Sequence, residues 1–323
     1  MNTKLNSQNI EELISTFGKR EAPDELMMKN AQAKVKAHWQ ASVKQQKTRR
    51  RRLSMMRIAA SFVALAAVLL LLKGNFLHSN PTNIGEVLFT QGTVSVSTNQ
   101  LDWHPLGTQT ALQTGQWLKT TDKSYINFAL SDQSQIRLNA NTVLHLDSTK
   151  QIHLLKGEIY HDADTQKSNP LLIKTQFGVI EHIGTRYAVS VNDKELVIKV
   201  RNGLVKLSAD TVQTTLNKGD LVELNPHGKY KKSYINAYDA QWNWTKKALK
   251  PFVLNHKNLA DFINNYAHEN GLEINWNKQE LIAKKVELVG DFAQLRDAQL
   301  LKTVFLSTKF DFEIKQGILT INP

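Results

Sequence analysis

A charge-free apolar run behind a row of arginines constrains this chain more than any other feature. Residues 58–72 are fifteen residues without a charged side chain. As a helix they span about 22 Å at 1.5 Å per residue. Extending the helix back to Leu53 gives about 30 Å, the usual thickness of the hydrocarbon layer, with Arg57 near one end. We therefore predict one transmembrane helix over residues 53–73.

A buried core helix and a cleaved secretory signal are the alternatives for this run. A core helix would not normally carry four arginines against its end, and a cleaved signal does not follow a polar segment of more than about fifty residues. The arginines that fix the orientation of the predicted span are Arg49, Arg50, Arg51 and Arg52. By the positive-inside rule they place the N-terminus in the cytoplasm and residues 74–323 on the far side of the membrane.

The charge of the chain is concentrated near this predicted span. The net charge is +12, and residues 26–57 hold ten basic residues and no acidic one. Such a stretch could be a nucleic-acid arm, but directly before an apolar run it indicates an anchor to membrane lipid, with no direct nucleic-acid contact. The chain has no cysteine, which excludes disulfides, thiolate metal sites and cysteine nucleophiles.

The expected cytoplasmic segment, residues 1–52, has the pattern of two short helices. The first stops at Gly18, and Pro23 with Asp24 marks the start of the second. The stripe of the second helix is Met28, Ala31, Val35 and Trp39. Two such helices bury little surface between them, so a loose hairpin and a surface completed by a partner protein are the alternatives. The expected partner-binding residues are Ile10, Leu13, Ile14, Phe17 and Trp39.

After a linker at residues 74–84, residues 85–225 have the pattern of an all-β domain. Short runs such as "GTVSVS" and "ELVIKV" alternate apolar and polar residues, which is typical of strands. We expect about ten short strands and almost no helix. Asn202-Gly203 is the strongest hairpin signal, because both central positions of a type I′ turn need positive φ.

The remainder is expected to be a second linker, residues 226–249, and a small α+β domain, residues 250–323. Apolar residues from Leu259 to Tyr266 recur at helical spacing and stop at Gly271, and a closing hairpin is expected around Gln316-Gly317. The expected order is strand, helix, strand, strand, helix, strand, strand.

No catalytic, cofactor or metal site is expected. The chain has no glycine-rich dinucleotide or phosphate loop, no G-x-S-x-G elbow and no H-E-x-x-H helix. His153, His161, Asp162 and Asp164 form the only local group of potential metal ligands. We interpret His153 as lying on a strand face, and the two aspartates as ending a strand and solvating a turn. Trp103, Trp117, Trp242 and Trp244 could stack on a sugar or base, although core and turn positions are commoner.

Several stretches of the β region share their pattern with a known family. They are "LSDQSQIRLNANTVL" (130–144), "LLKGEIYHDA" (154–163), "GVIEHIGTRYAVSV" (178–191), and "VRNGLVKLS" with "LNKGDLVEL". On these residues the region resembles the FecR domain. The matching positions are Asp132, Ser134, Leu138, Asn139, Gly157, Glu158, Gly184, Thr185, Gly203 and Gly219. They read as turn and barrel-corner features, and Gln133 stands where the family pattern has glycine.

The resemblance implies a function. FecR domains are the periplasmic part of membrane-anchored regulators of extracytoplasmic-function sigma factors, of the anti-sigma and iron-dicitrate sensor type. Residues 250–323 resemble the secretin/TonB short N-terminal domain that commonly follows them. A cytoplasmic sigma factor is then the inner partner, and the signalling domain of a TonB-dependent outer-membrane transducer is the outer one. Cleavage at or near the span by an intramembrane protease is a further implied step.

Two other functions stay open at this point. One is a cell-envelope scaffold or secretion-associated protein that uses the terminal domain for assembly and has no transcriptional role. The other is a periplasmic enzyme or sugar binder that uses the tryptophans. Together the patterns predict a multidomain single-pass membrane protein with a short α-helical N-terminal segment, one transmembrane helix, an all-β FecR-like domain and a small α+β C-terminal domain.

Overall fold

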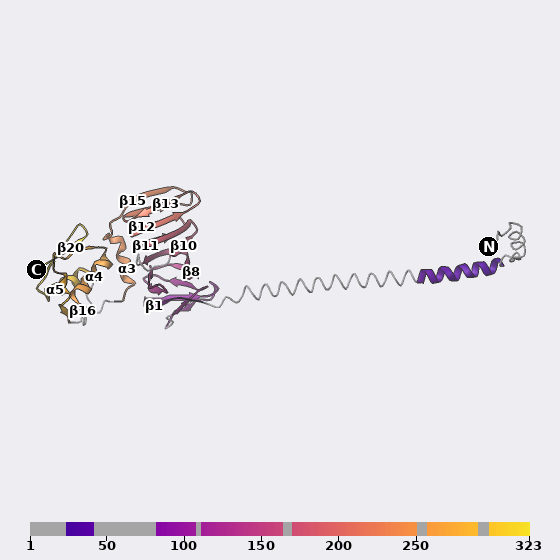
Figure 1. Ribbon diagram of the computed structural model, residues 1–323, viewed down its shortest axis with the longest axis horizontal. Coiled ribbons are helices and arrows are strands. Elements are labelled where there is room, and N and C mark those ends of the chain that lie inside the picture. The colour runs from indigo at the N-terminus through magenta and orange to yellow at the C-terminus, as the bar shows by residue number, and fades with distance from the viewer. Residues whose placement is uncertain (1–23, 42–81, 108–110, 164–169, 251–256, 290–296) are drawn as a thin grey trace, which may run out of the picture. The chain divides into compact units, whose positions relative to one another are not determined.

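A computed structural model describes residues 24–41, 82–107, 111–163, 170–250, 257–289 and 297–323 (Figure 1). The chain divides into two compact units, Met1–Ser79 and Asn80–Pro323, and each is described by itself. The predicted span and the arginines before it lie outside the described residues. In the part of the chain that is described, no helix is both long enough and apolar enough to cross a membrane.

The first unit contains a helix over residues 25–41. It begins after Pro23, as the sequence predicts. Asp24 caps it through its side chain: the carboxylate Oδ1 accepts a hydrogen bond from Leu26 N at 3.4 Å, while the Asp24 carbonyl accepts the first helical bond, from Met28 N at 3.0 Å. The side-chain bond satisfies one of the N–H groups that the first turn of a helix leaves without a partner. The described residues of this helix are all exposed.

Strands dominate the first part of the second unit, as the sequence predicts. They number more than the ten expected, and three of them are long. They are β1 (Asn83–Gln91), β2 (Val94–Ser97), β3 (His104–Pro105), β4 (Ala111–Gln113), β5 (Trp117–Thr120), β6 (Tyr125–Leu130), β7 (Gln135–Leu138), β8 (Val143–Ser148), β9 (Gln151–Asp162), β10 (Leu172–Thr175), β11 (Gly178–Val191), β12 (Leu196–Ser208), β13 (Gln213–Asn217), β14 (Asp220–Leu224) and β15 (Tyr230–Tyr234).

The long strands β9, β11 and β12 exchange partners midway along their length. The first part of β9 pairs with β8 and β10, and the second part pairs with β7 and β11. The first part of β12 pairs with β14 and the second part with β13. The pairings therefore join all fifteen strands in one sheet that follows two paths, in the orders β15-β14-β12-β11-β9-β7-β6-β1-β4 and β13-β12-β11-β10-β9-β8-β5-β2-β3. We call these paths the two layers of the domain.

One buried apolar cluster holds these layers together. It takes the inward residue of each alternating pair, such as Ile126 and Phe128 on β6, or Ile198 and Val200 on β12. All four are fully buried. Each such side chain contributes about 1.5 to 3 kcal/mol relative to an exposed position. The alternation seen in the sequence thus places one apolar face of each strand toward this cluster.

The Asn202-Gly203 hairpin prediction is wrong. Both residues lie inside β12, which runs through them without a turn. Pairing with β11 shifts register twice there, from Ile183↔Leu204 to Arg186↔Asn202 and then to Tyr187↔Val200. The dipeptide therefore lies in a bulged stretch of the strand pair, where the first extra residue is on β11. Gly203 has φ +82°, which fits the left-handed glycine of such a bulge. The sequence therefore indicated positive φ correctly at Gly203. It did not reveal that β12 pairs with β11 both before and after the dipeptide, which excludes a hairpin there.

The segment 226–249, expected to be a linker, is structured. β15 extends the sheet beside β14, and a 3₁₀ helix η1 (Ala240–Trp242) and α3 (Asn243–Lys247) follow. Trp242 packs edge-to-face on Tyr160 with ring centroids 6.0 Å apart, and its Nε1 donates to the Asn236 carbonyl at 2.9 Å. Trp242 and Trp244 are both buried, so they are core residues and not exposed stacking platforms.

The C-terminal module, residues 257–323, follows the predicted order with one short helix added. Its elements are β16 (Lys257–Asn258), α4 (Leu259–Asn270), β17 (Glu273–Asn275), α5 (Glu280–Ala283), β18 (Glu287–Leu288), α6 (Asp297–Leu306), β19 (Asp311–Lys315) and β20 (Ile318–Asn322). α4 ends at Gly271 in the left-handed conformation, and the β19–β20 hairpin turns at Gln316 and Gly317, both with positive φ. Both boundaries agree with the sequence analysis.

Candidate functional site

The N-terminal helix presents an apolar face that nothing in the described part of its unit covers. Val35 is 70% exposed and Trp39 is 65% exposed. Together with Ala31 they line a shallow hollow whose rim is formed by Gln32 and Lys36. A large exposed apolar patch of this kind marks an interaction site more often than a free surface. Of the expected partner-binding residues, only Trp39 is described; Ile10, Leu13, Ile14 and Phe17 lie outside the described residues.

The first motif residues, Asp132 and Ser134, form the turn between β6 and β7. Asp132 Oδ1 accepts hydrogen bonds from Ser134 N at 3.0 Å and Ser134 Oγ at 2.7 Å. Between them Gln133 has φ +70°, the left-handed conformation that the family's glycine adopts without strain. The side-chain bonds of the aspartate hold this turn although glycine is missing.

A second group of motif residues supports the bend of β9. Gly157 has φ +95°, and a Cβ built on it would lie 2.4 Å from the Cα of Thr142. Next to it, Glu158 pairs with Lys199 Nζ at 2.8 Å and accepts a hydrogen bond from Asn139 Nδ2 at 2.9 Å. Only glycine fits this close approach, so the motif here is structural. Leu138 is part of the apolar core.

The remaining motif residues lie at the bulge of β11 and β12 and at a turn. A Cβ on Gly203 would lie 2.4 Å from the Gly184 carbonyl oxygen, and Thr185 Oγ1 donates to the Leu204 carbonyl at 2.6 Å. Gly219, with φ +88°, packs against the ring of Tyr234. The motif positions thus shape bends and turns, and they do not converge on one pocket.

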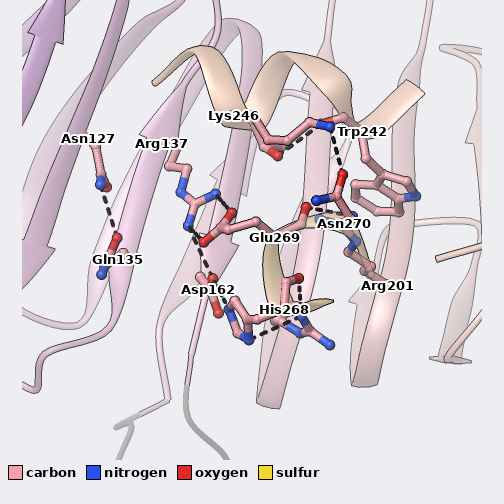
Figure 2. Close-up of polar contacts among 12 residues, drawn as sticks. Asn127, Gln135, Arg137, Asp162, Arg201, Trp242, Lys246, His268, Glu269 and Asn270 are labelled. Carbon is pink, nitrogen blue, oxygen red and sulfur yellow. Dashed lines mark hydrogen bonds and ion pairs between the residues drawn. The ribbon is translucent and has the colours of Figure 1, made fainter. Parts of the chain in front are cut away.

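The polar cluster that the sequence did not reveal lies where the C-terminal module meets the β-sheet (Figure 2). Arg137 on β7 is 1% exposed and donates two hydrogen bonds to the Glu269 carboxylate, at 2.6 and 2.9 Å. It also lies 3.3 Å from Asp162 Oδ2 at the end of β9. Burial lowers the pKa of Arg137, but Glu269, Tyr160 and Asp162 more than offset this and raise the pKa, so the residue is a permanent cation.

Two further arginines bind the end of α4. Arg186 Nη1 on β11 donates to the His268 carbonyl at 2.9 Å, and Arg201 Nη2 on β12 donates to the Glu269 carbonyl at 3.0 Å. Both carbonyls are in the last turn of the helix, where backbone oxygens lack the regular helical partner four residues on, although the His268 carbonyl also accepts a bond from Gly271 N at 3.2 Å. We call Arg137, Arg186 and Arg201 the arginine clamp. Its target is the negative end of the helix and the carboxylate of Glu269.

Asp162 belongs to this cluster and does not solvate a turn, which corrects the sequence interpretation. Its side chain is 13% exposed, and its Oδ2 accepts a hydrogen bond from His268 Nε2 at 2.8 Å. Burial alone would raise the pKa of Asp162, but the hydrogen bond and charge of His268, with Arg137 and Arg186, lower it to about 2. Asp164, the other aspartate of that group, lies outside the described residues.

Asp162, His268 and Glu269 are close enough together to be tested as a metal site. The donor set does not fit one. Both carboxylates are already bound by the Arg137 guanidinium, and Arg186 lies 3.3 Å from the other ring nitrogen of His268. A metal ion would have to displace a buried cation that binds Glu269 in the bidentate geometry typical of strong pairs. The cluster is therefore an ion-pair joint.

A second polar group is buried in the β domain. His161 Nε2 lies 3.1 Å from Ser134 Oγ, and the His161 ring stacks edge-on against His182 with centroids 4.4 Å apart. Burial and the neighbouring His182 lower the pKa of His161 to about 3. Burial also raises the pKa of the nearby Tyr187 hydroxyl. His161 and Tyr187 are therefore neutral at physiological pH.

The sequence carried a weak signal for the arginine clamp. In "LVIKVRNG" the residues Lys199 and Arg201 alternate with Ile198 and Val200, which places them together on the face opposite the core. Both are nevertheless buried, at 6% and 2% exposure. Lys199 and Arg201 are covered by η1, α3 and the end of α4, which are distant from them in the sequence. Alternation alone therefore predicts that this face of β12 is exposed to solvent.

Comparisons with known proteins agree with the family resemblance. Residues 116–206 match the model of the FecR protein family. No curated protein matches the chain. Two crystal structures, at 1.65 and 2.50 Å resolution, of a proposed anti-sigma factor from Parabacteroides distasonis are similar at 15% identity over 64% of this chain and 97% of that chain. Their TM-score of 0.36 is below the level that indicates a shared overall fold.

Proposed function

We propose that this chain, which contains a FecR region over residues 116–206, is a single-pass inner-membrane regulator of the anti-sigma type. Its N-terminal helices bind an extracytoplasmic-function sigma factor in the cytoplasm. Its β-rich domain and C-terminal module lie in the periplasm and receive a protein signal from a TonB-dependent outer-membrane transducer. Proteolysis at or near the membrane span is a further step of the relay in this proposal.

The observation that carries this proposal is the position of the FecR match relative to the apolar run. The run at 58–72, with arginines on one side, separates a helical segment from the matched region. Because the arginines favour the cytoplasm, the helical segment and the FecR region belong on opposite sides of the membrane. A chain arranged in this way can carry a signal across without transporting anything.

The exposed stripe of the N-terminal helix supports the inner half of the proposal. Val35 and Trp39 lie on one face of the helix with Met28 and Ala31, because their spacing is three, four and four residues. Such a face binds in a hydrophobic groove of a partner. Burying Val35 and Trp39 would contribute roughly 1.5 to 3 kcal/mol each before ordering costs.

The test is sigma-factor capture by the full-length chain in cells, by cross-linking and mass spectrometry. Trp39→Asp places a charge in the stripe and should reduce capture by roughly a hundredfold, because an unpaired carboxylate would be buried in the interface. Ala37→Asp is the matched control, since Ala37 lies on the opposite face of the same helix and is also exposed. It should leave capture unchanged.

The same logic applies to the first predicted helix. Replacing Ile14 and Phe17 by Asp should release transcription of the target genes. If the full-length chain captures no sigma factor, and both the Asp variants and the control leave transcription unchanged, the envelope-scaffold alternative is favoured and the proposal is wrong. Capture that is lost equally in Trp39→Asp and Ala37→Asp would show that the stripe is not the binding surface.

A further inference from the structure

The C-terminal module meets the β domain through charged and polar contacts. Among the described residues, the buried apolar clusters stop at the boundary: one lies within residues 84–224, one within residues 259–321, and the third joins the sheet to η1 and α3 only. The bonds that cross the boundary come from the arginine clamp, from His268 to Asp162, from Lys246 to Asn270 and from Lys218 to Glu273.

The two sides of this joint are complementary in charge. The sheet provides the three arginines of the clamp with one carboxylate, Asp162, and α3 adds Lys246. The module provides the carboxylate of Glu269 and the last carbonyls of α4, which carry the negative end of the helix dipole. Figure 2 shows Arg137 and Glu269 pointing toward each other, with Asp162 and His268 beside them. Attraction between the sides therefore sets the orientation of the module.

Gly271 allows the close approach that this joint needs. It ends α4 with φ +66°, and a Cβ there would lie 2.0 Å from the Ala237 carbonyl oxygen and 2.7 Å from Arg201 Nε. Gly317 plays a similar part, since a Cβ on it would lie 2.4 Å from the ring of Tyr238. Two glycines of the module thus lie in close contact with residues 237 and 238. The contact is specific in shape as well as in charge.

The net stability of the joint is nevertheless limited. Burying charges costs free energy that their mutual attraction recovers only if every donor is satisfied. In the described part of the chain, Arg137 Nε and Arg201 Nη1 are buried without a hydrogen-bond partner. Interfaces between domains that lack a large apolar core open readily. The joint thus combines a single specific geometry with a small free-energy difference between docked and undocked states.

We propose that the arginine clamp is a reversible latch, which holds the C-terminal module on the β domain in one state and releases it in another. Release frees the end of α4 and uncovers three arginines on neighbouring strands. The latch belongs to the outer part of the chain alone, and it operates whether or not the inner part binds a sigma factor.

The test measures a distance across the joint in the full-length purified chain in lipid nanodiscs. Because the chain has no cysteine, spin labels can be placed at Lys206→Cys and Glu313→Cys without a competing site. Both residues are exposed, and neither contacts the clamp. Double electron-electron resonance then reports a narrow distance for the docked state and a broad one for the undocked state.

Three variants are compared on this background. Glu269→Gln removes the charge bound by Arg137 and should raise the undocked population roughly tenfold or more. Arg186→Ala removes one bond to the helix end and should raise it several-fold. Glu280→Gln is the matched control, because Glu280 forms an exposed ion pair with Lys284 away from the joint and should leave the distances unchanged.

Amide hydrogen exchange in α4 shows whether each variant keeps the module folded. A broad distance with intact protection of α4 supports the latch. If Glu269→Gln does not fold, Arg186→Ala decides, since its side chain is only half-buried. A narrow distance that persists in Arg186→Ala and in a folded Glu269→Gln, or equal broadening in Glu280→Gln, would overturn the proposal. Because no sigma factor is present, this result is independent of the function proposed above.

Discussion

His161 makes the β domain sensitive to mild acid. Its pKa falls from an ordinary value of 6.5 to about 3 because the ring is buried beside His182. The unfolded chain then binds a proton below pH 6.5 that the folded chain does not, so the free energy of unfolding declines as pH falls from 6.5 towards 3. For one histidine the loss between pH 7 and pH 5 is about 2 kcal/mol.

Urea unfolding of the 80–323 portion at pH 7 and pH 5 measures this loss. His161→Gln keeps a polar side chain at the position but cannot be protonated, so it should remove about 2 kcal/mol of the pH dependence even if it lowers stability at pH 7. If the variant and the parent lose the same free energy between the two pH values, other groups are responsible.

Gln133 holds a conformation that suits glycine. At φ +70° an L-residue is strained by about 1 to 2 kcal/mol, whereas glycine is not, although glycine costs about 0.5 to 1 kcal/mol more entropy on folding. Gln133→Gly should therefore raise the free energy of unfolding by about 0.5 kcal/mol. Gln133→Val should lower it by more than about 1 kcal/mol, because a β-branched side chain tolerates positive φ least. Equal midpoints of denaturation for the two variants would contradict this explanation.

The sequence was sufficient to locate residues with positive φ. It was not always sufficient to say whether such a residue ends a helix, forms a hairpin turn or lies in a bulge. The C-cap at Gly271 and the hairpin at Gln316-Gly317 depend on neighbouring residues only, and both were predicted. At Asn202-Gly203 the same preference for positive φ appears inside a strand of thirteen residues. Whether such a dipeptide makes a hairpin or a bulge depends on how far β11 continues as a partner, which is a tertiary property.

At the scale of the strand, the bulge in β12 leads to a direct prediction. Gly203→Ala combines a left-handed backbone at φ +82° with a Cβ placed 2.4 Å from the Gly184 carbonyl oxygen. It should lower the free energy of unfolding by about 2 to 4 kcal/mol. Gly115→Ala is a matched control, since Gly115 has φ +83° but no atom within 4 Å of the added Cβ.

Gly115→Ala should lower the free energy of unfolding only by the backbone strain, about 1 to 2 kcal/mol. The difference in the free energy of unfolding between the two variants, measured with urea, is the cost of the steric clash between the added Cβ at position 203 and its neighbours. If Gly203→Ala and Gly115→Ala cost the same, the strand adjusts around the added methyl group and the close approach is not what requires glycine there.

For the molecule as a whole, the order of its parts was predictable and the joint between them was not. The change from period two to helical spacing near residue 257 separated the β domain from the C-terminal module. The segment 226–249 carried proline, glycine and lysine and read as a linker, yet Trp242 within it packs on Tyr160 and lies 5.2 Å above the Arg201 guanidinium. Such a contact joins residues more than forty positions apart in the sequence. It does not change the spacing of apolar residues in either segment, so the sequence pattern cannot predict it.

The topology of the chain gives the broadest prediction. Ten basic residues and no acidic one lie in residues 26–57, next to the apolar run. We predict that the favourable insertion of that run outweighs the cost of Arg57 near its end, and that the positive charge keeps the N-terminus inside. A fluorescent protein fused to the N-terminus should therefore fold in the cytoplasm and fluoresce, and alkaline phosphatase fused after Pro323 should be active in the periplasm.

Deleting residues 58–72 is the control, because the phosphatase should then stay in the cytoplasm and lose activity. Replacing the four arginines at 49–52 by glutamine should give a mixture of orientations, since only Arg57 and the more distant lysines would remain to favour the inside. Full phosphatase activity in the deletion variant, or activity of only one of the two reporters in the parent chain, would remove the membrane span and with it the separation of compartments on which the regulatory role depends.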